Sequence, residues 1–574
     1  MPVHNDDIAA VFDEIGDLLD IEGANPFRVR AYRNAARHLR GLPQEAADLL
    51  NRGQDLTELP GIGRELAAKI AEVVHSGTCR ALLKLRQEVP HDLAELLQLP
   101  GLGPKRVHAL YFDLDIHNAE QLYRAAKDGR LQELPGFGPK TAQRVIDALE
   151  THLGEQRRFK LATAARYAEP LAAYLRGVAG AEEVVLAGSY RRSRDTVGDL
   201  DVLVTANRPA AVMEAFVGYD EVRQVLARGA TRATAILGCG LQVDLRVVEA
   251  RSLGAALHYF TGSKAHNIAV RGIARKMGLK VNEYGVFRGA QRVAGETEAS
   301  VFAAVDLPFI PPELRENRGE IEAARAGLLP RLVEVGDLRG DLHVHTRATD
   351  GQGTLEEMVA AARAAGLGYI AVTEHSKRLT MAHGLDSCRL LQQVEEIDRL
   401  NASLRGFHVL KGIEVDILED GSLDLPDEVL GHLDLVVDAV HSRFNLSRAQ
   451  QTRRILRALD HPHFSLLAHP SGRLLQAREP YDVDMARIIR HARDRGCFLE
   501  LNAHPERLDL IDAHCQMARE EGVLVSINSD AHSTLDYANL RYGVGQARRG
   551  WLEAKDVLNT RPLSEVRRLL KATL

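Results

Sequence analysis

The sequence predicts a multidomain α/β protein in three parts, and three observations lead to this interpretation. Residues 1–150 carry leucine and alanine at helical spacing, with frequent Gly and Pro between the segments. Residues 184–250 change to short apolar runs typical of strands. Beyond residue 320, strand-like runs alternate with helical segments, the pattern of βα units around a parallel sheet. We expect a helical part, a mixed-sheet part and a βα barrel, in that order.

Length and composition exclude several classes of protein. At about 100–200 residues per domain, the 574 residues make several domains. The chain is 45% hydrophobic and 26% charged, as globular proteins are. Its five cysteines form no C-x-x-C pair, its acidic start is unlike a signal peptide, and its apolar runs fall short of a membrane helix. We therefore expect a cytoplasmic protein without a membrane partner.

Charge and histidine are spread unevenly along the chain. The net charge is −6, yet residues 251–300 hold eight Lys/Arg against three Asp/Glu. Residues 401–450 hold four Lys/Arg against nine Asp/Glu, and 14 of the 23 histidines lie in the last 234 residues. This contrast predicts a polyanionic ligand for the middle of the chain and metal cations for the C-terminal part.

A short phrase repeats three times in the helical part: LPGIGRELAAKI at 59–70, LPGLGPKRVHAL at 99–110 and LPGFGPKTAQRV at 134–145. Each copy places two glycines in a tight turn before a helix, whose free N–H groups then face an anion. This is the helix-hairpin-helix motif, which holds a DNA phosphate without reading sequence. The glycines of one copy alone could simply cap a helix junction, but three copies favour DNA binding. The glycines assigned to DNA are Gly61, Gly63, Gly101, Gly103, Gly136 and Gly138.

The stretch GSYRRSRDTVGDLDVLVT (188–205) carries two carboxylates on one predicted strand. Asp199 and Asp201 face the same side of that strand, and Asp244 lies on the next one. Three like charges this close need cations, and two Mg²⁺ or Mn²⁺ ions would serve both them and a nucleotide's phosphates. Asp-x-Asp alone is more often structural, but the upstream G-S-Y-R-R and the second strand favour catalysis. The nucleotide-binding residues assigned to this stretch are Gly188, Ser189, Arg192 and Gly198.

With these motifs, the region resembles the palm of family X DNA polymerases, the repair group that includes DNA polymerase β. The resemblance continues through LHYFTGSKAHNIAVRGIARKMGLKVNEYGVF at 257–287. It implies that Tyr259, Phe260 and Gly262 contact the nucleotide sugar. It also implies that Asn267 contacts the base and Arg271 the template. Ordinary core packing is the alternative for the two aromatic residues.

Residues 1–85 resemble the small lyase domain of that family, through FRVRAYRNAAR (27–37) and the first Gly-x-Gly phrase. The resemblance places Lys69 as a Schiff-base nucleophile toward a 5′-deoxyribose phosphate, which requires a deprotonated amine. The alternative is an ordinary i,i+4 surface pair between Glu65 and Lys69. Family lysines are replaced by Arg28 and Glu65, so a weaker 5′-phosphate pocket is expected.

The C-terminal part carries DLHVHTRATDG, VTEHS, GIEVDI, AVHS, LAHP and INSDAH, mostly at the ends of predicted strands. Nine nitrogen and oxygen ligands without cysteine suit Mn²⁺, Zn²⁺ or Fe²⁺, and they can hold up to three ions if Glu414 bridges. Such a cluster would attack a phosphodiester with a metal-activated hydroxide. The nine residues are His343, His345, Asp350, His375, Glu414, His441, His469, Asp530 and His532.

These residues match the ligand pattern of the polymerase and histidinol phosphatase (PHP) domain, a distorted (β/α)₇ barrel. Glu374 departs from the Asp found before the His in many members. Glu500, Asn502 and Arg473 are expected to contact phosphate or water. A polymerase joined to a PHP domain is the arrangement of bacterial and archaeal family X enzymes, in which the PHP domain supplies a Mn²⁺-dependent 3′→5′ exonuclease and often cleaves abasic sites.

The resemblance covers the whole chain and predicts six segments: a lyase-like domain (1–85), a second helix-hairpin-helix part (86–150), a palm (151–255), a nucleotide- and template-contacting part (256–320), a linker (321–340) and a PHP domain (341–574). It implies a monomeric, nucleoid-associated repair polymerase. That enzyme would fill gapped or primer-template DNA from dNTPs in base excision repair.

Three alternatives stay open: a template-independent nucleotidyltransferase, a scaffold for DNA ends, and a 3′-end-processing nuclease with vestigial synthesis.

Overall fold

The computed structural model describes residues 5–573, except 41, 43–44, 60, 89–95, 97–101, 115, 117–118, 135–136, 139–140, 142–144, 146–157 and 572. The chain forms two compact units, residues 1–157 and 158–574. Within the described residues, no helix combines the length and the apolar character needed to span a bilayer.

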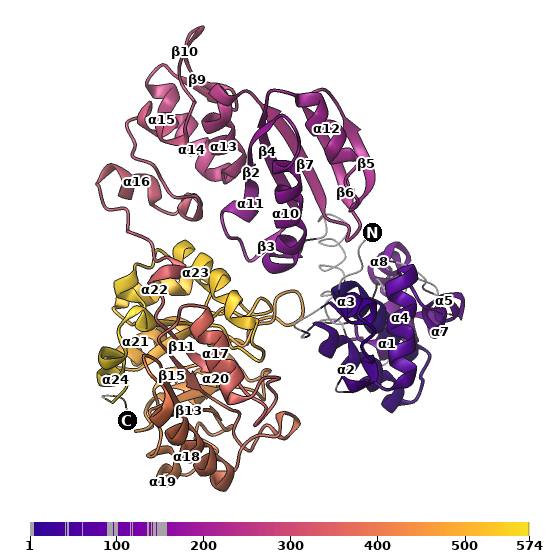
Figure 1. Ribbon diagram of the computed structural model, residues 1–574, viewed down its shortest axis with the longest axis vertical. Helices are drawn as coiled ribbons and strands as arrows, with labels where there is room; N and C mark the ends of the chain where they lie inside the picture. Colours follow the sequence, from indigo (N-terminus) through magenta and orange to yellow (C-terminus); the bar gives the residue numbers. More distant parts are fainter. Residues whose placement is uncertain are drawn as a thin grey trace. The chain divides into compact units, whose positions relative to one another are not determined.

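The described residues of the first unit form helices joined by turns and contain no strand (Figure 1). Its helices are α1 (Asn5–Ile21), α2 (Pro26–Arg40), α3 (Ala46–Asn51), α4 (Arg64–Ser76), α5 (Arg80–Glu88), α7 (Pro104–Leu114) and α8 (Ala119–Lys127). Helix α2 buries Val29, Tyr32 and Ala36, which recur at helical spacing on one face. The rings of Phe12 and Tyr32 meet edge to face at 5.6 Å and join α1 to α2.

The second unit begins with the palm, a five-stranded mixed sheet of order β2-β4-β7-β6-β5. Strands β4 and β7 are parallel, and the other neighbours are antiparallel. Helices α10 and α12 pack on one face of the sheet, and a short β1–β3 ribbon lies beside it (Figure 1). The elements are β1 (Phe159–Lys160), α10 (Leu161–Arg176), β2 (Ala181–Leu186), α11 (Gly188–Arg191), β3 (Thr196–Val197), β4 (Asp199–Ala206), α12 (Pro209–Val217), β5 (Val222–Arg228), β6 (Arg232–Leu237) and β7 (Gln242–Val248).

A smaller α+β part follows, with its own apolar core around Phe302 and Val270. Its elements are α13 (Leu253–Thr261), α14 (Lys264–Lys276), β8 (Lys280–Asn282), β9 (Gly285–Arg288), β10 (Gln291–Ala294), α15 (Glu298–Ala303) and α16 (Glu320–Arg325). Much of α16 lies in the segment expected to be a linker, yet Ile321 and Ala324 are buried in this core. The start of that segment is therefore packed against the preceding part.

The rest of the unit is a barrel of seven parallel strands in sequence order, β11 to β17. A parallel bridge between Val344 and Ala531 brings the first and last strands together, so the barrel is nearly closed. The strands are β11 (Gly340–Val344), β12 (Tyr369–Val372), β13 (His408–Asp416), β14 (Leu435–Ala439), β15 (Leu466–Leu467), β16 (Phe498–Asn502) and β17 (Val525–Asn528). The helices are α17 (Leu355–Ala364), α18 (Ser387–Ser403), α19 (Asp427–Leu430), α20 (Arg448–Leu459), α21 (Met485–Arg495), α22 (Asp512–Glu521), α23 (Leu540–Arg549) and α24 (Leu563–Lys571).

Alternate residues of the barrel strands serve two different cores. Leu435 and Val437 of β14 belong to the cluster that fills the barrel, whereas Val436 belongs to the cluster shared with the surrounding helices. The strands are buried on both faces, which explains their continuous apolar sequences. The predicted fold class is thus confirmed in its three parts: a helical N-terminal region, a mixed-sheet palm and a seven-stranded βα barrel.

Candidate active sites

Three carboxylates meet at one edge of the palm sheet. Asp199 is the first residue of β4, directly after Gly198, and Asp201 lies two residues further on the same face. Asp244 on β7 is paired with Asp201 in the parallel register of the two strands. The structure therefore brings together the three aspartates that the sequence singled out.

Burial and like charge raise the pKa of two of these carboxyls. Burial, assisted by the charges of Asp199 and Asp244, raises the pKa of Asp201 to about 7. Burial and Asp244 also raise the pKa of Asp199. Asp244 accepts hydrogen bonds from Thr234 Oγ1 (2.6 Å) and Gln242 Nε2 (2.8 Å). Because these groups resist ionisation together, this oxygen-only donor set fits divalent cations.

The turn before the carboxylates lies against them. Gly188 has φ +65°, and a Cβ on it would fall 2.6 Å from Asp201 Oδ2, so the close approach requires glycine. Ser189 follows it in the short helix α11. The guanidinium of Arg192 donates from Nε to Glu316 Oε1 (3.0 Å) and from Nη1 to the carbonyl of the last residue of α13. Arg192, expected at the nucleotide phosphates, is thus oriented by a carboxylate from outside the palm.

The five residues assigned to the sugar, base and template lie on α13, on α14 and at Gly262, which caps the C-terminal end of α13. Asn267 is buried, and its Nδ2 donates to the carbonyl of Tyr259 (2.7 Å). A Cβ on Gly262 would fall 3.1 Å from the same amide nitrogen. Phe260 stacks under a guanidinium from β7 at 4.5 Å, and Arg271 Nε donates to the carbonyl of Asn267 (3.2 Å). The packing of these residues joins the palm to the start of the next part.

Four of the six glycines assigned to DNA begin or precede helical turns. Gly61 has φ +74°, and Gly63 is the N-terminal cap of α4. The carbonyl of Gly103 accepts from two backbone N–H groups in α7, and that of Gly138 accepts from Thr141 N (2.8 Å). Two glycines of the set lie outside the described residues: Gly101 and Gly136.

Lys69 on α4 forms an ion pair with Glu65 at 2.6 Å. Burial acts to lower the pKa of the Lys69 ammonium, but the hydrogen bond to Glu65 outweighs it, and the pKa is raised. The expected nucleophile needs the opposite shift. The i,i+4 pair weighed as the alternative is therefore the contact present.

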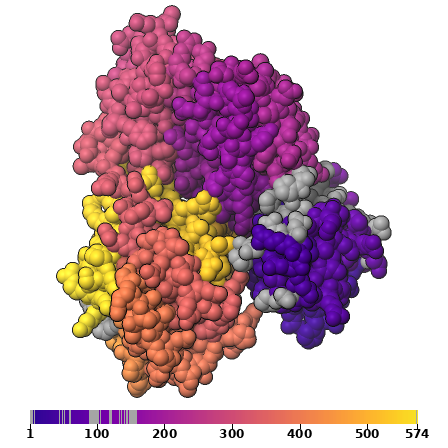
Figure 2. Space-filling view, viewed as in Figure 1, coloured from indigo at the N-terminus to yellow at the C-terminus, as the bar shows by residue number. Residues whose placement is uncertain are grey.

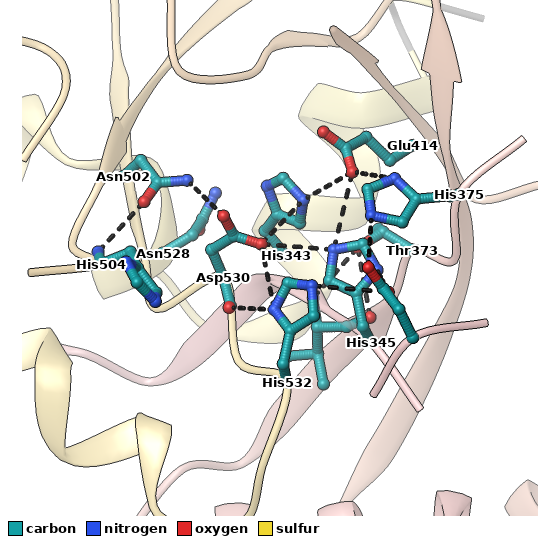
Figure 3. Close-up of polar contacts among 12 residues, drawn as sticks. His343, His345, Thr373, His375, Glu414, Asn502, His504, Asn528, Asp530 and His532 are labelled. Carbon is teal, nitrogen blue, oxygen red and sulfur yellow. Dashed lines mark hydrogen bonds and ion pairs between the residues drawn. The ribbon is translucent and has the colours of Figure 1, made fainter. Parts of the chain in front are cut away.

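The nine histidines and carboxylates of the C-terminal part converge at one end of the barrel. Figure 3 labels part of this set: His343, His345, His375, Glu414, Asp530 and His532. His343 and His345 belong to β11, and Glu414 belongs to β13. The other members follow the ends of β11, β12, β14, β15 and β17: Asp350, His375, His441, His469, Asp530 and His532. Three groups within this set place one potential ligand atom of each member within 4.8 Å of the others.

Glu414 lies at the centre of this cluster. Its Oε2 is 2.8 Å from His375 Nδ1 and 3.4 Å from His343 Nε2. Its Oε1 is 2.9 Å from His469 Nε2 and 3.2 Å from His441 Nε2. One carboxylate therefore reaches several of the ligand groups, as a bridging ligand must.

The cluster fits metal ions by its unsatisfied nitrogens and its charge. Among the described residues, buried imidazole nitrogens of the cluster lie near carboxylate oxygens without forming a hydrogen bond to them; they belong to His343, His345, His375 and His441. Burial acts to raise the pKa of Glu414, but the charges of His375, His343 and His441 outweigh it and hold it well below its usual value. Burial acts to lower the pKa of His375, but Glu414 and its neighbours raise it to about 10. Neutral imidazole nitrogens together with carboxylate oxygens are donors that suit Zn²⁺, Mn²⁺ or Fe²⁺.

A buried layer behind the ligands fixes their orientation. Glu500 Oε1 accepts from His343 Nδ1 (2.7 Å), and Glu500 Oε2 accepts from the backbone N–H of His469 (2.7 Å). Asn502 Nδ2 donates to Asp530 Oδ2 (3.0 Å). Both Glu500 and Asn502 are fully buried, and a contact of either with phosphate or water stays a prediction. They orient ligands.

Glu374, the departure from the family pattern, belongs to the same layer. Its carboxylate accepts from Thr346 N (2.9 Å) and Gln393 Nε2 (3.2 Å), and it also bonds the hydroxyls of Thr346 and Thr349. These bonds tie down the turn that leads to Asp350. The longer side chain of Glu374 thus holds this turn in place through both of its carboxylate oxygens.

Sequence reasoning missed two residues beside Asp530. His504 lies on the opposite side of Asp530 from Glu414 (Figure 3), and Arg507 Nε is 3.8 Å from Asp530 Oδ2. Arg473, expected to contact phosphate or water, donates to the carbonyl of Arg507 (2.8 Å) and to Asp195 Oδ2 (3.1 Å). Both missed residues lie in the loop that follows β16. Their place after a barrel strand was the only feature of the sequence that could have indicated a role in the site.

Family models match four parts of the chain: a helix-hairpin-helix domain at 3–79, a SAM-like helix-hairpin-helix tandem at 93–151, a DNA polymerase beta thumb at 256–316 and a PHP domain at 341–558. The PHP match contains all nine residues of the barrel cluster.

Relatives match the chain in whole or in part. Probable phosphatases of Thermoanaerobacter sp. (strain X514) and Acetivibrio thermocellus are 28% and 29% identical, over 38% and 34% of this chain and 89% and 80% of their own length. The DNA polymerase/3′-5′ exonuclease PolX of Bacillus subtilis (strain 168) is 38% identical over 573 residues, 99% of this chain and all of its own. A chain that matches PolX from end to end, and carries both the palm carboxylates and the PHP cluster, belongs to the PolX family, the family X DNA polymerases with a PHP domain.

Proposed function

We propose that this enzyme extends a DNA primer at the palm and shortens a DNA 3′ end at the barrel, on gapped or primer-template DNA. The observation that carries this proposal is that both metal-type clusters are complete in one chain. A scaffold for DNA ends would not need either cluster. A template-independent transferase would not need the repeated helix-hairpin-helix glycines.

At the palm, Asp199, Asp201 and Asp244 would hold two Mg²⁺ or Mn²⁺ ions. These ions supply activation of the primer 3′-hydroxyl and neutralise the triphosphate charge of a dNTP. The chain itself supplies the rest of the site. The backbone of the turn at Gly188 and Ser189 lies close enough to the carboxylates to bind phosphate oxygens at the same place.

Nucleotide selection would rest on the residues of α13 and α14. Arg192, already oriented by Glu316, provides a guanidinium for the departing phosphates. Tyr259, Phe260 and Gly262 form the wall for the sugar, and Gly198 leaves room for the triphosphate. Asn267 and Arg271 follow on α14, where we place the base and the template contacts.

At the barrel, the nine clustered residues would hold up to three ions of Mn²⁺, Zn²⁺ or Fe²⁺. These ions supply a hydroxide nucleophile and polarise the phosphodiester. Glu500 and Asn502 hold His343 and Asp530 in the orientation that the cluster needs. The same chemistry applies to removal of 3′ blocks and to cleavage at abasic sites, which we include in the proposal.

The N-terminal unit would hold the DNA backbone through the glycines of its three repeats. For Lys69, the ion pair with Glu65 and the raised pKa favour a protonated side chain. We therefore propose that Lys69 attracts the 5′-phosphate of a gap, and that lyase chemistry at this residue is secondary. Gap filling in base excision repair is the role that joins these activities.

The test uses a labelled primer on a one-nucleotide gap with a 5′-phosphate, in Mg²⁺ or Mn²⁺, with and without dNTPs. Template-matched extension is expected to disappear in the Asp199→Ala/Asp201→Ala double variant and to persist in His343→Ala/His345→Ala. Shortening is expected to show the reverse pattern. Extension that survives loss of both palm carboxylates would refute the palm assignment, and shortening without template-matched extension would favour the nuclease alternative.

A further inference from the structure

The loop between β16 and α22 reaches the barrel cluster from the side of Asp530. In its 504–509 segment, the backbone N–H of His504 donates to Asn502 Oδ1 (3.0 Å), and Arg507 Nε lies 3.8 Å from Asp530 Oδ2. The Arg507 side chain is 21% exposed, and among the described residues its guanidinium makes no hydrogen bond. A guanidinium with unused N–H groups beside a metal-type cluster is suited to a phosphate oxygen.

This 504–509 segment is attached to the palm rather than to the barrel alone. Glu506 forms a short ion pair with Lys160 of β1. Leu508 is 2% exposed and belongs to the apolar cluster of the palm, together with Leu475 from the preceding barrel loop. The carbonyl of Glu506 accepts from Leu475 N (2.7 Å), which joins the two barrel loops. In Figure 2, yellow atoms of the last part of the chain lie against purple atoms of the palm.

Arg473 provides a second attachment. It donates from Nε to the carbonyl of Arg507 (2.8 Å) and from Nη2 to the carbonyl of Leu508 (2.5 Å). Its remaining nitrogen donates to Asp195 Oδ2 of the palm (3.1 Å). Arg473 is 9% exposed, so the palm carboxylate balances a charge that would otherwise be buried without a partner. The backbone of Arg507 is thus held by a side chain whose own counter-ion lies in the palm.

We propose that the palm forms part of the nuclease site. Asp195 and Lys160 hold the 504–509 segment, and the segment presents Arg507 to a phosphate of the DNA strand being shortened. Arg507 contacts substrate, whereas Asp195, Lys160 and Arg473 are positioning residues. The inference rests on the proposed nuclease function of the barrel and adds the group that binds the substrate phosphate.

The physical reason is that the segment contains no helix and is fixed on the barrel side by turns and a single antiparallel bridge between Asn502 and Asp509. A substrate-binding group displaced by about 1 Å can cost about 100-fold in rate. The barrel supplies the ligands and the bridge at Asp509, and the palm supplies two further attachments, through Lys160 and Asp195. These contacts between the 504–509 segment and the palm also explain why the β1–β3 ribbon, which precedes Asp199, lies against barrel loops.

The test compares full-length variants on a 5′-labelled single-stranded oligonucleotide in Mn²⁺. Arg507→Ala is expected to raise KM for DNA by about 10- to 100-fold, since it removes a charge-assisted contact to phosphate. Asp195→Ala and Lys160→Met are each expected to raise KM about 3- to 10-fold, because each removes one attachment. The matched control is Arg541→Ala, which breaks the palm–barrel ion pair with Glu169 (2.9 Å) away from this segment. It is expected to leave KM unchanged.

Two further measurements separate positioning from general damage. Bound manganese, measured by mass spectrometry, is expected to stay at the wild-type level in all four variants. Amide hydrogen exchange in 504–509 is expected to accelerate in Asp195→Ala and in Lys160→Met but not in Arg541→Ala. Asp195→Asn keeps an oxygen acceptor for Arg473, so its KM for DNA is expected to be close to that of the wild type.

Each outcome decides between the proposals. A wild-type enzyme without shortening activity would overturn the nuclease assignment itself, and this inference with it. Shortening with an unchanged KM in Arg507→Ala, at normal metal content, would overturn only the phosphate contact and this inference. If Asp195→Ala fails to fold, Lys160→Met tests the other attachment of the segment to the palm, the ion pair with Glu506. Unchanged exchange and KM in that variant would overturn the role of the palm.

Discussion

The two candidate active sites solve the problem of clustered charge in opposite ways. The palm edge gathers three carboxylates, and burial with like charge raises the pKa of Asp201 to about 7. The barrel end mixes carboxylates with histidines. There, neighbouring imidazoles overcome burial and hold the pKa of Glu414 well below its usual value, while that of His375 is raised to about 10.

This difference shows which site needs a cation to neutralise its own charge. The palm carboxylates cannot all ionise at neutral pH without a cation, so the site is completed by the metal that arrives with a nucleotide. At the barrel, neighbouring carboxylates outweigh burial and raise the pKa of four imidazoles, so a metal ion must displace protons to bind them; these belong to His343, His375, His441 and His532. Nine nitrogen and oxygen donors converge at the barrel, whereas the palm offers three carboxylates. We therefore expect tightly held ions at the barrel and weak, exchangeable ions at the palm.

The largest expected effects come from the central residue of each site. Asp201→Ala should lower primer extension by at least about 10³-fold, and Glu414→Gln should lower 3′ shortening by a similar factor. Each variant should keep the other activity, because the two side chains share no partner. Primer extension and shortening on the same gapped DNA provide the measurement. Loss of both activities in either variant would contradict the separation.

Glu500→Gln tests the layer behind the barrel ligands. It replaces the carboxylate that accepts from His343 Nδ1 with an amide, so we expect a 10- to 100-fold loss of metal affinity or nuclease activity. Added Mn²⁺ should restore part of the loss. Titration of shortening activity against Mn²⁺ measures it, and unaltered primer extension is the control. A wild-type titration curve would show that Glu500 does not tune the cluster.

Gly188→Ala tests the close approach at the palm. The new Cβ would fall 2.6 Å from Asp201 Oδ2, in a backbone conformation with φ +65°. We expect a loss of extension of about 10- to 100-fold, because the carboxylate must move away from its partners. Gly198→Ala is a milder comparison, since its Cβ would lie 3.4 Å from a flexible guanidinium. Equal extension by the two variants would argue against the steric explanation.

The smallest effect concerns stability in the absence of metal. Burial raises the pKa of Asp201 from 3.8 to about 7 in the folded protein, so the folded state binds more protons than the unfolded state between those values. Stability contributed by this group therefore falls as pH rises through that window. Asp201→Asn should stabilise the EDTA-treated protein by about 1–3 kcal/mol at pH 8 and by little near pH 4.

Unfolding in denaturant at the two pH values checks this prediction. A stabilisation of equal size at both would mean that the substitution acts through packing rather than charge. Destabilisation at pH 8 would contradict the raised pKa.

Much of both sites followed from the sequence, for identifiable reasons. The two-residue period of a strand places Asp199 and Asp201 on one face, and parallel βα units bring residues at strand ends to one end of a barrel. Those rules act locally or through topology, so motif spacing was enough for the palm carboxylates and for the nine barrel residues. The fold class was predictable for the same reason.

The missed features depend on contacts between distant segments. Glu506 meets Lys160 across 346 positions of sequence, and Arg473 meets Asp195 across 278. The inward orientation of Glu500 depends on its bond to His343, 157 positions away. Periodicity cannot identify such partners, since it says which face a residue occupies but not what lies opposite. The role of Arg507 was hidden in the same way.

The most direct test of the central claim is the metal retained by each site. The full-length protein is loaded with Mn²⁺ at pH 8, free metal is removed, and bound manganese is counted by mass spectrometry. We predict that the wild type and Asp199→Ala/Asp201→Ala retain equal amounts, and that His343→Ala/His345→Ala retains much less. The account would be contradicted if Asp199→Ala/Asp201→Ala lost its bound manganese while His343→Ala/His345→Ala kept it.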